Sequence, residues 1–116
     1  MILITEVRVV VRKRLFLDDE RYPTHKSNWI IVRTVEDAKR EVLQNGPFEF
    51  ISFDHDLGED LTGYDFVKWL CEYDHDNNFK IIPKNFEYRV HSMNPIGKKN
   101  IENYLQSYMK FRDNSS

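Results

Sequence analysis

Apolar residues gather in four short runs along this chain, and each run predicts a buried strand. The runs span residues 15–17, 29–32, 48–53 and 86–90. The run at 15–17 is continuous and ends abruptly in acidic residues, which is typical of a buried central strand. Three of the four runs end abruptly in charged or polar residues. Such endings are expected where the carboxyl ends of strands reach the rim of a sheet.

Apolar residues at helical spacing follow the second, third and fourth runs. The first predicted helix begins at Thr34 and ends near residue 45, and the second runs to about Tyr73, followed by a polar connection at 74–78. The third begins near Pro95. Its apolar stripe consists of Ile101, Tyr104, Leu105 and Tyr108. Strands that alternate with helices predict an α/β fold with a parallel sheet.

A single domain is predicted at residues 15–111, with an N-terminal extension at 1–14 and a polar tail at 112–116. Apolar and polar residues alternate in the extension, as in a strand. We expect it to lengthen the first strand. The alternatives are an added edge strand or a homodimer contact, since an exposed apolar edge would invite aggregation.

Composition and charge narrow the function classes. The chain has 116 residues, and 17 basic against 19 acidic side chains give a net charge of -2. This balance argues against nonspecific binding to DNA. Cys71 is the only cysteine, so a reducing, cytoplasmic location is expected. Glu6 and Arg8 interrupt the apolar N-terminus, so neither a signal peptide nor a membrane span is expected.

Acidic residues follow two of the predicted strands, at the rim where parallel strands place their ligands. They are Asp18, Asp19, Asp54 and Asp56. Carboxylates gathered in one place repel each other, so they need a cation, an arginine or a raised pKa. Oxygen ligands of this kind suit a divalent cation, and Mg²⁺ is the expected cofactor. For each aspartate alone, a solvated strand end or a helix cap would be the ordinary role.

Two histidines, His55 and His91, come directly after the third and fourth strands. If these strands are neighbours, their backbones lie about 5 Å apart, and the two imidazoles could share one substrate. Opening a cyclic phosphodiester needs such a pair, one ring to take a proton and one to give a proton. A purely structural role is the alternative for each ring. His25 and His75 are interpreted as surface residues in polar loops.

Donors for a phosphate group are also available near the rim. The candidates are Arg21, Arg33, Ser92 and Asn94. Arg21 could instead neutralise the neighbouring aspartates, and Asn94 could instead cap the last helix. The sequence contains no Gly-rich phosphate loop, no zinc-ligand spacing and no familiar Ser-His-Asp order, so those mechanisms are not expected.

Four motifs in this order resemble the cyclic-phosphate-processing receiver-like family (cREC), which is related to the receiver domains of two-component signalling. The motifs are Leu15-Phe16-Leu17-Asp18-Asp19-Glu20-Arg21, Ser52-Phe53-Asp54-His55-Asp56-Leu57-Gly58, Thr62-Gly63-Tyr64-Asp65 and His91-Ser92-Met93-Asn94-Pro95-Ile96-Gly97. The resemblance covers residues 15–105. It implies a receiver-like (flavodoxin-like) sheet of four to five strands flanked by helices and trimmed at its C-terminal end.

The resemblance also implies an activity. The receiver's acidic pocket, here Asp18, Asp19 and Asp54, has gained His55 and His91, and the family is associated with cyclic phosphates in RNA repair or nucleotide signalling. We therefore expect a phosphodiesterase or hydrolase acting on an RNA 2',3'-cyclic end or a cyclic nucleotide. The alternatives are a signalling domain that is phosphorylated on Asp54 and a protein that binds a cyclic nucleotide without turnover. No fifth strand with a lysine is evident, which argues against the signalling alternative.

Overall fold

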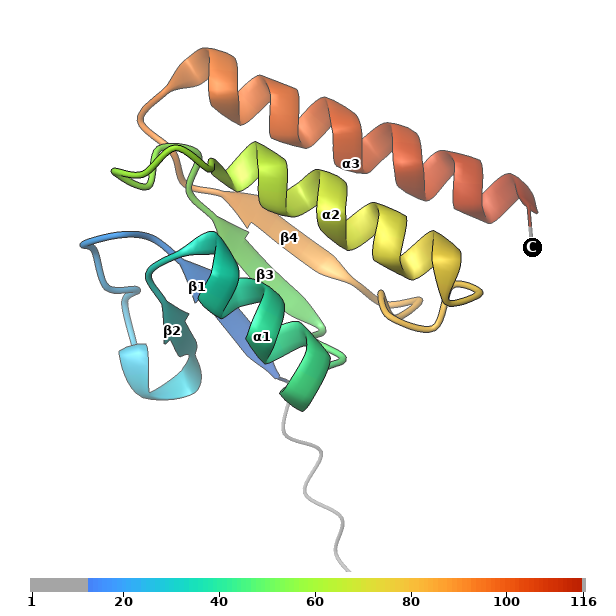
Figure 1. The fold of residues 1–116 in the computed structure, drawn as a ribbon, viewed down its shortest axis with the longest axis horizontal. Coiled ribbons are helices and arrows are strands. Elements are labelled where there is room, and N and C mark those ends of the chain that lie inside the picture. The colour runs from blue at the N-terminus through green and yellow to red at the C-terminus, as the bar shows by residue number, and fades with distance from the viewer. Residues whose placement is uncertain (1–12, 116) are drawn as a thin grey trace, which may run out of the picture.

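The four predicted strands pair into one parallel sheet with the strand order β2-β1-β3-β4. A computed structural model of the chain describes residues 13–115. The elements are β1 (Arg14–Leu17), η1 (Lys26–Asn28), β2 (Ile30–Val32), α1 (Val35–Asn45), β3 (Phe50–Phe53), α2 (Gly63–Asp76), β4 (Glu87–Val90) and α3 (Pro95–Ser115) (Figure 1). This order matches the first four strands of a receiver-like sheet.

The predicted fold class is confirmed: four parallel strands are flanked by three helices, and no fifth strand occurs within residues 13–115. Residues 1–12 of the N-terminal extension lie outside the described part of the chain, so the structure does not test the expectations for this extension. Within that part, no helix has the length and apolar character needed to cross a lipid bilayer.

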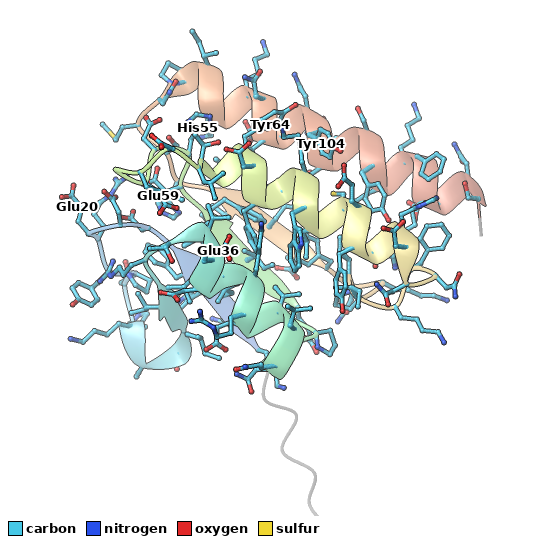
Figure 2. The ribbon with its side chains drawn as sticks, viewed as in Figure 1. Glu20, Glu36, His55, Glu59, Tyr64 and Tyr104 are labelled. Atoms are coloured by element: carbon cyan, nitrogen blue, oxygen red, sulfur yellow. The ribbon has the colours of Figure 1, made fainter. Side chains whose placement is uncertain are left out.

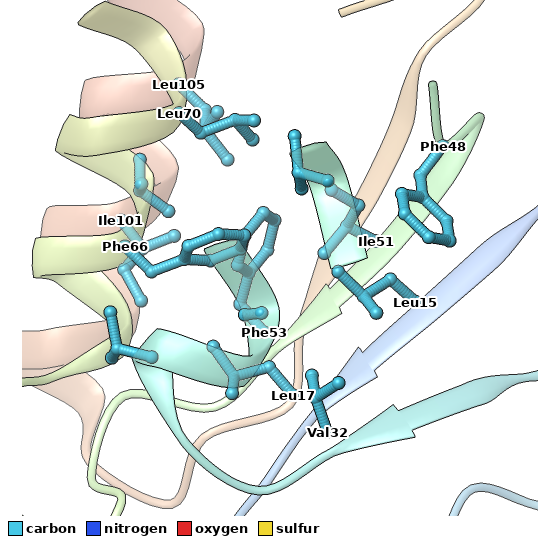
Figure 3. Packing of buried hydrophobic residues seen from close by; sticks show 14 of the residues in the cluster. Leu15, Leu17, Val32, Phe48, Ile51, Phe53, Phe66, Leu70, Ile101 and Leu105 are labelled. Carbon is cyan, nitrogen blue, oxygen red and sulfur yellow. The ribbon is translucent and has the colours of Figure 1, made fainter. Parts of the chain in front are cut away.

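All three helices pack on the same face of the sheet (Figure 1). Side chains alternate between the two faces of a strand, so Leu15 and Leu17 point toward the helices, where both are completely buried. Phe53 joins them from β3, and Phe66 and Leu105 meet them from α2 and α3 (Figure 3). Each of these side chains contributes roughly 1.5–3 kcal/mol by leaving water.

The opposite face of the sheet carries no α-helix in the described chain, because the connection from β1 to β2 forms only a loop with the short helix η1. Phe16 points to this face. Its ring meets Trp29 edge to face at 5.9 Å between centroids, and Trp29 meets Phe50 in the same way at 5.2 Å. Aromatic side chains and a loop therefore cover part of this face in place of a helix.

Residues 74–76 of the predicted polar connection and residues 112–115 of the predicted polar tail are helical instead. Asp74 lies inside α2 and is completely buried, and Arg112 lies inside α3 and is 6% exposed. Asp74 accepts hydrogen bonds from the backbone amides of Ile81 and Ile82 (3.0 and 2.7 Å), from Tyr108 Oη (2.6 Å) and from Arg112 Nη1 (3.3 Å). This buried ion pair joins α2 and α3, so both helices continue past their predicted ends to the residues that form it. His75, in the last turn of α2, is exposed as expected although it is not in a loop.

Replacing Arg112 with methionine should strongly destabilise the fold, because Asp74 would keep a buried charge without its cationic partner. Loss of one partner of a buried pair typically lowers the free energy of unfolding by about 3–5 kcal/mol. Urea unfolding followed by circular dichroism measures the change. Lys110→Met, at an exposed position on the same helix, is the control, and equal unfolding midpoints for the two variants would contradict the prediction.

Candidate active site at the carboxyl ends of the strands

Asp18, Asp54 and His91 come together at the carboxyl ends of β1, β3 and β4. One ligand atom from each lies within 4.8 Å of the others. Their backbone amides still donate to the neighbouring strand, to Val32 O (3.2 Å), Leu17 O (2.9 Å) and Phe53 O (2.9 Å) respectively. The sheet itself therefore fixes the three side chains relative to one another.

The carboxylate of Asp18 is completely buried and fully engaged by protein donors. Oδ1 accepts from the backbone amides of Glu20 (2.9 Å) and Arg21 (2.8 Å), and Oδ2 accepts from Arg21 Nε (3.0 Å) and His91 Nε2 (3.0 Å). Burial alone would raise the pKa of Asp18, but these hydrogen bonds outweigh it and hold the pKa below its ordinary value. Asp18 is therefore ionised at neutral pH.

Asp54 is 4% exposed and has a different electrostatic environment. Its Oδ1 accepts from the backbone amide of His55 (2.9 Å), and its Oδ2 lies 3.6 Å from Arg21 Nη2. Burial and the neighbouring charge of Asp18 raise the pKa of Asp54. Arg21 thus spans Asp18 and Asp54, whereas the alternative drawn from the sequence placed it beside Asp18 and Asp19.

The His91 ring is held from three sides. Its Nε2 faces Asp18, its Nδ1 lies 2.7 Å from Ser52 Oγ, and its face stacks on Phe16 at 4.5 Å between centroids. An ionised carboxylate can only accept, so Nε2 carries the hydrogen and Nδ1 of the neutral ring accepts from the hydroxyl. Burial lowers the pKa of His91 despite the nearby carboxylate of Asp18, so the ring is largely neutral at neutral pH.

His55 makes separate contacts from His91, although β3 and β4 are neighbours as expected. Its Nδ1 lies 2.8 Å from Asp56 Oδ1, and its ring fills the space beside Gly97 where any Cβ would clash. Figure 2 shows His55 at the rim beside the first turn of α2, where Tyr64 is also labelled. Each histidine is oriented by its own aspartate, and the described hydrogen bonds join the two rings to no common partner.

The other two aspartates lie outside the buried cluster. Asp19 and Asp56 are exposed, and neither belongs to the described group of candidate metal ligands, which is Asp18, Asp54 and His91. Asp56 also accepts from Asn94 Nδ2 (3.3 Å), and the hydrogen bond from His55 lowers its pKa. Of the four carboxylates expected to share a cation, only Asp18 and Asp54 therefore belong to the buried cluster.

The remaining predicted phosphate donors already have structural partners. Arg33 Nη1 donates to the carbonyl oxygens of Asp18 (3.0 Å) and Arg21 (2.6 Å), and so shapes the loop after β1. Asn94 Oδ1 accepts from the Gly97 amide (3.0 Å), and Ser92 Oγ accepts from the Asn94 amide (3.1 Å). Asn94 therefore caps the beginning of α3, and Ser92 holds the turn that precedes it. Whether these residues also bind phosphate stays a prediction.

Two hollows adjoin the cluster, and Arg21 lines both. The open-face cavity, about 490 Å³, lies between the sheet and the β1–β2 loop. Its walls include Phe16, Trp29, Ser52, His91 and the arginines Arg14, Arg21 and Arg89. The second hollow, about 400 Å³, lies at the rim between Asp19, Asp54, Asp56 and Ser92. The arginines make the open-face cavity the better place for an anion.

Ser52 is the site residue that the sequence analysis missed. Its order relative to Asp18 and His91 matches no familiar arrangement, so the chain order gave no signal. Ser52 could have been found from its position two residues before Asp54, because residues two apart on a strand lie on the same face of the sheet.

Comparison with protein families supports the sequence resemblance. A family described as the cyclic-phosphate processing receiver domain matches residues 13–107. No curated protein and no solved structure matches the chain. The match spans the whole sheet, all three helices up to the last turns of α3, and every residue of the cluster at the strand ends. The chain therefore belongs to the cyclic-phosphate processing receiver domain family.

Proposed function

We propose that this protein hydrolyses a cyclic phosphodiester, either an RNA 2',3'-cyclic end or a cyclic nucleotide, to the ring-opened phosphomonoester. The observation that carries the proposal is His91, a neutral ring oriented by an ionised aspartate and facing a cavity with three arginines. A phosphodiester is an anion, and ring opening requires one proton transfer to the leaving sugar oxygen. Membership of the family supports the substrate class.

His91 is the proton-transfer group of the proposed reaction, whereas His55, the second ring expected from the sequence, lines neither of the two hollows described above. Asp18 fixes the hydrogen of His91 on Nε2, which leaves Nδ1 as the basic nitrogen of the ring. Asp56 orients His55 in the same way from the rim. The guanidinium group of Arg89, which lines the open-face cavity, is placed to balance the negative charge of the phosphate.

Arginine, rather than a metal ion, neutralises the carboxylates in this proposal. Asp18 accepts four hydrogen bonds, which occupy the acceptor sites of a carboxylate. A Mg²⁺ ion could bind Asp18 only by displacing Arg21 or His91. The expected magnesium cofactor therefore does not fit at Asp18 while these donors are in place, and no step is assigned to it.

Substituting His91 with alanine should lower turnover by about a hundredfold or more, because the main proton-transfer group is lost. Purified protein is incubated with RNA 2',3'-cyclic ends and with cyclic mono-, di- and oligonucleotides, and products are identified by mass spectrometry. His55→Ala should lower turnover much less, because this ring lines neither described hollow. His75→Gln, at an exposed position in α2, should leave turnover unchanged.

The same panel separates the alternative functions. Intact ligand released in stoichiometric amounts from denatured protein would indicate binding without turnover. A stable acyl phosphate on Asp54 after incubation with a small phosphodonor would indicate receiver-type signalling. Wild-type turnover by the folded His91→Ala variant would remove His91 from the mechanism.

Millimolar magnesium should leave the Tm of the wild-type protein unchanged but should raise the Tm of Arg21→Ala. Removing the guanidinium frees Asp18 and Asp54 to bind a cation, and ligand at ten times its Kd adds about 1.4 kcal/mol of stability. In a domain of this size, that corresponds to roughly 5 °C. Differential scanning fluorimetry measures the shift, with Arg40→Ala on α1 as the control. A Tm increase in the wild-type protein would restore the metal-bound alternative.

A further inference from the structure

We propose that Ser52 is the nucleophile of this site, attacking phosphorus to form a covalent phosphoserine diester before water completes the hydrolysis. This inference rests on the proposed function and specifies its chemistry. It is carried by the continuous hydrogen-bonded chain from Ser52 Oγ through His91 to Asp18, with distances of 2.7 Å and 3.0 Å. A nucleophile, a base and an orienting carboxylate in this connectivity are the parts that activate a serine.

The ionised carboxylate of Asp18 determines the direction of proton transfer between Ser52 and His91. Its ionised oxygens accept from Nε2, so Nδ1 must accept, and the only described donor to Nδ1 is the Ser52 hydroxyl. A water molecule would have to displace this hydroxyl before His91 could deprotonate it. The first proton that His91 is placed to take is therefore that of Ser52.

The sheet places Ser52 where a substrate phosphate could reach it. Ser52 is 3% exposed, and the cavity on the open face of the sheet is the hollow that it lines. In the register of β3 and β4, Arg89 lies directly opposite Ser52 and lines the same cavity. A phosphate that reached the Ser52 hydroxyl would therefore lie beside a guanidinium group able to bind its non-bridging oxygens.

The proposed reaction balances with water as the only co-reactant. Ser52 Oγ forms a bond to phosphorus while its proton moves to His91 Nδ1. One ring P–O bond breaks, and the leaving sugar oxygen takes that proton. Water then attacks phosphorus and gives a proton to Nδ1, the Oγ–P bond breaks, and Oγ regains the proton. The products are a ring-opened phosphomonoester and the original serine.

Labelling with a fluorophosphonate tests the nucleophile without requiring the natural substrate. The wild-type protein should gain one phosphonyl group, which peptide mapping should locate on Ser52. Ser52→Ala should not be labelled there, and His91→Ala should be labelled about a hundredfold more slowly. Ser107→Ala, at an exposed serine of α3, is the control and should match the wild type. Labelling of Ser52 that is equally fast without His91 would overturn the proposed activation.

The stereochemical course separates this inference from the proposed function. A cyclic phosphorothioate opened in ¹⁸O-water should retain its configuration at phosphorus, because two successive displacements each invert it. Inversion, together with turnover by Ser52→Ala, would show direct attack by water and would overturn the role of Ser52 while leaving the hydrolase function intact. Absence of turnover for every cyclic phosphate, with Ser52 still labelled, would instead overturn the proposed function and retain the activated serine.

Discussion

Asp18 accepts hydrogen bonds from two backbone amides, an arginine and a histidine, and the candidate site depends on these four contacts. The amide bonds fix the turn that follows β1, the bond to Arg21 brings a cation between the two buried carboxylates, and the bond to His91 sets the tautomer of its ring. A buried carboxylate is costly unless every oxygen is paired. In this site, the donors that pair the Asp18 carboxylate are the same groups that form the turn after β1 and hold Arg21 and His91 in place.

The open face of the sheet gives this arrangement access to a ligand. In a doubly wound fold, helices cover both faces, but here a loop with one turn of 3₁₀-helix follows β1. The open-face cavity lies under this loop, and His91, Ser52 and Arg89 all point into it because they occupy alternate positions on their strands. The trimmed receiver fold thus exposes side chains that a covering helix would bury.

The opposite end of the molecule holds the helices in place. Asp74 accepts hydrogen bonds from side chains of α3 and from the backbone of the segment after α2. These bonds hold α3 against α2, and the other end of α3 begins at the rim of the sheet. The start of α3 is where Gly97 leaves room for the ring of His55. The position of His55 therefore depends on both ends of α3, one fixed by a buried ion pair and the other by a glycine.

The sequence by itself determined the strands, the helices and the clustering of Asp18, Asp54 and His91 at one rim, because apolar runs and their polar endings are local patterns. Only the tertiary structure decided which side chains face each other. His55 and His91 follow neighbouring strands, but the register pairs Phe53 with Val90. His91 therefore lies one residue beyond this pair, and His55 lies two residues beyond it. Because successive side chains alternate between the two faces of a sheet, the two rings point to opposite faces. Ser52 meets His91 for the converse reason, since register and alternation bring residues together regardless of their order along the chain.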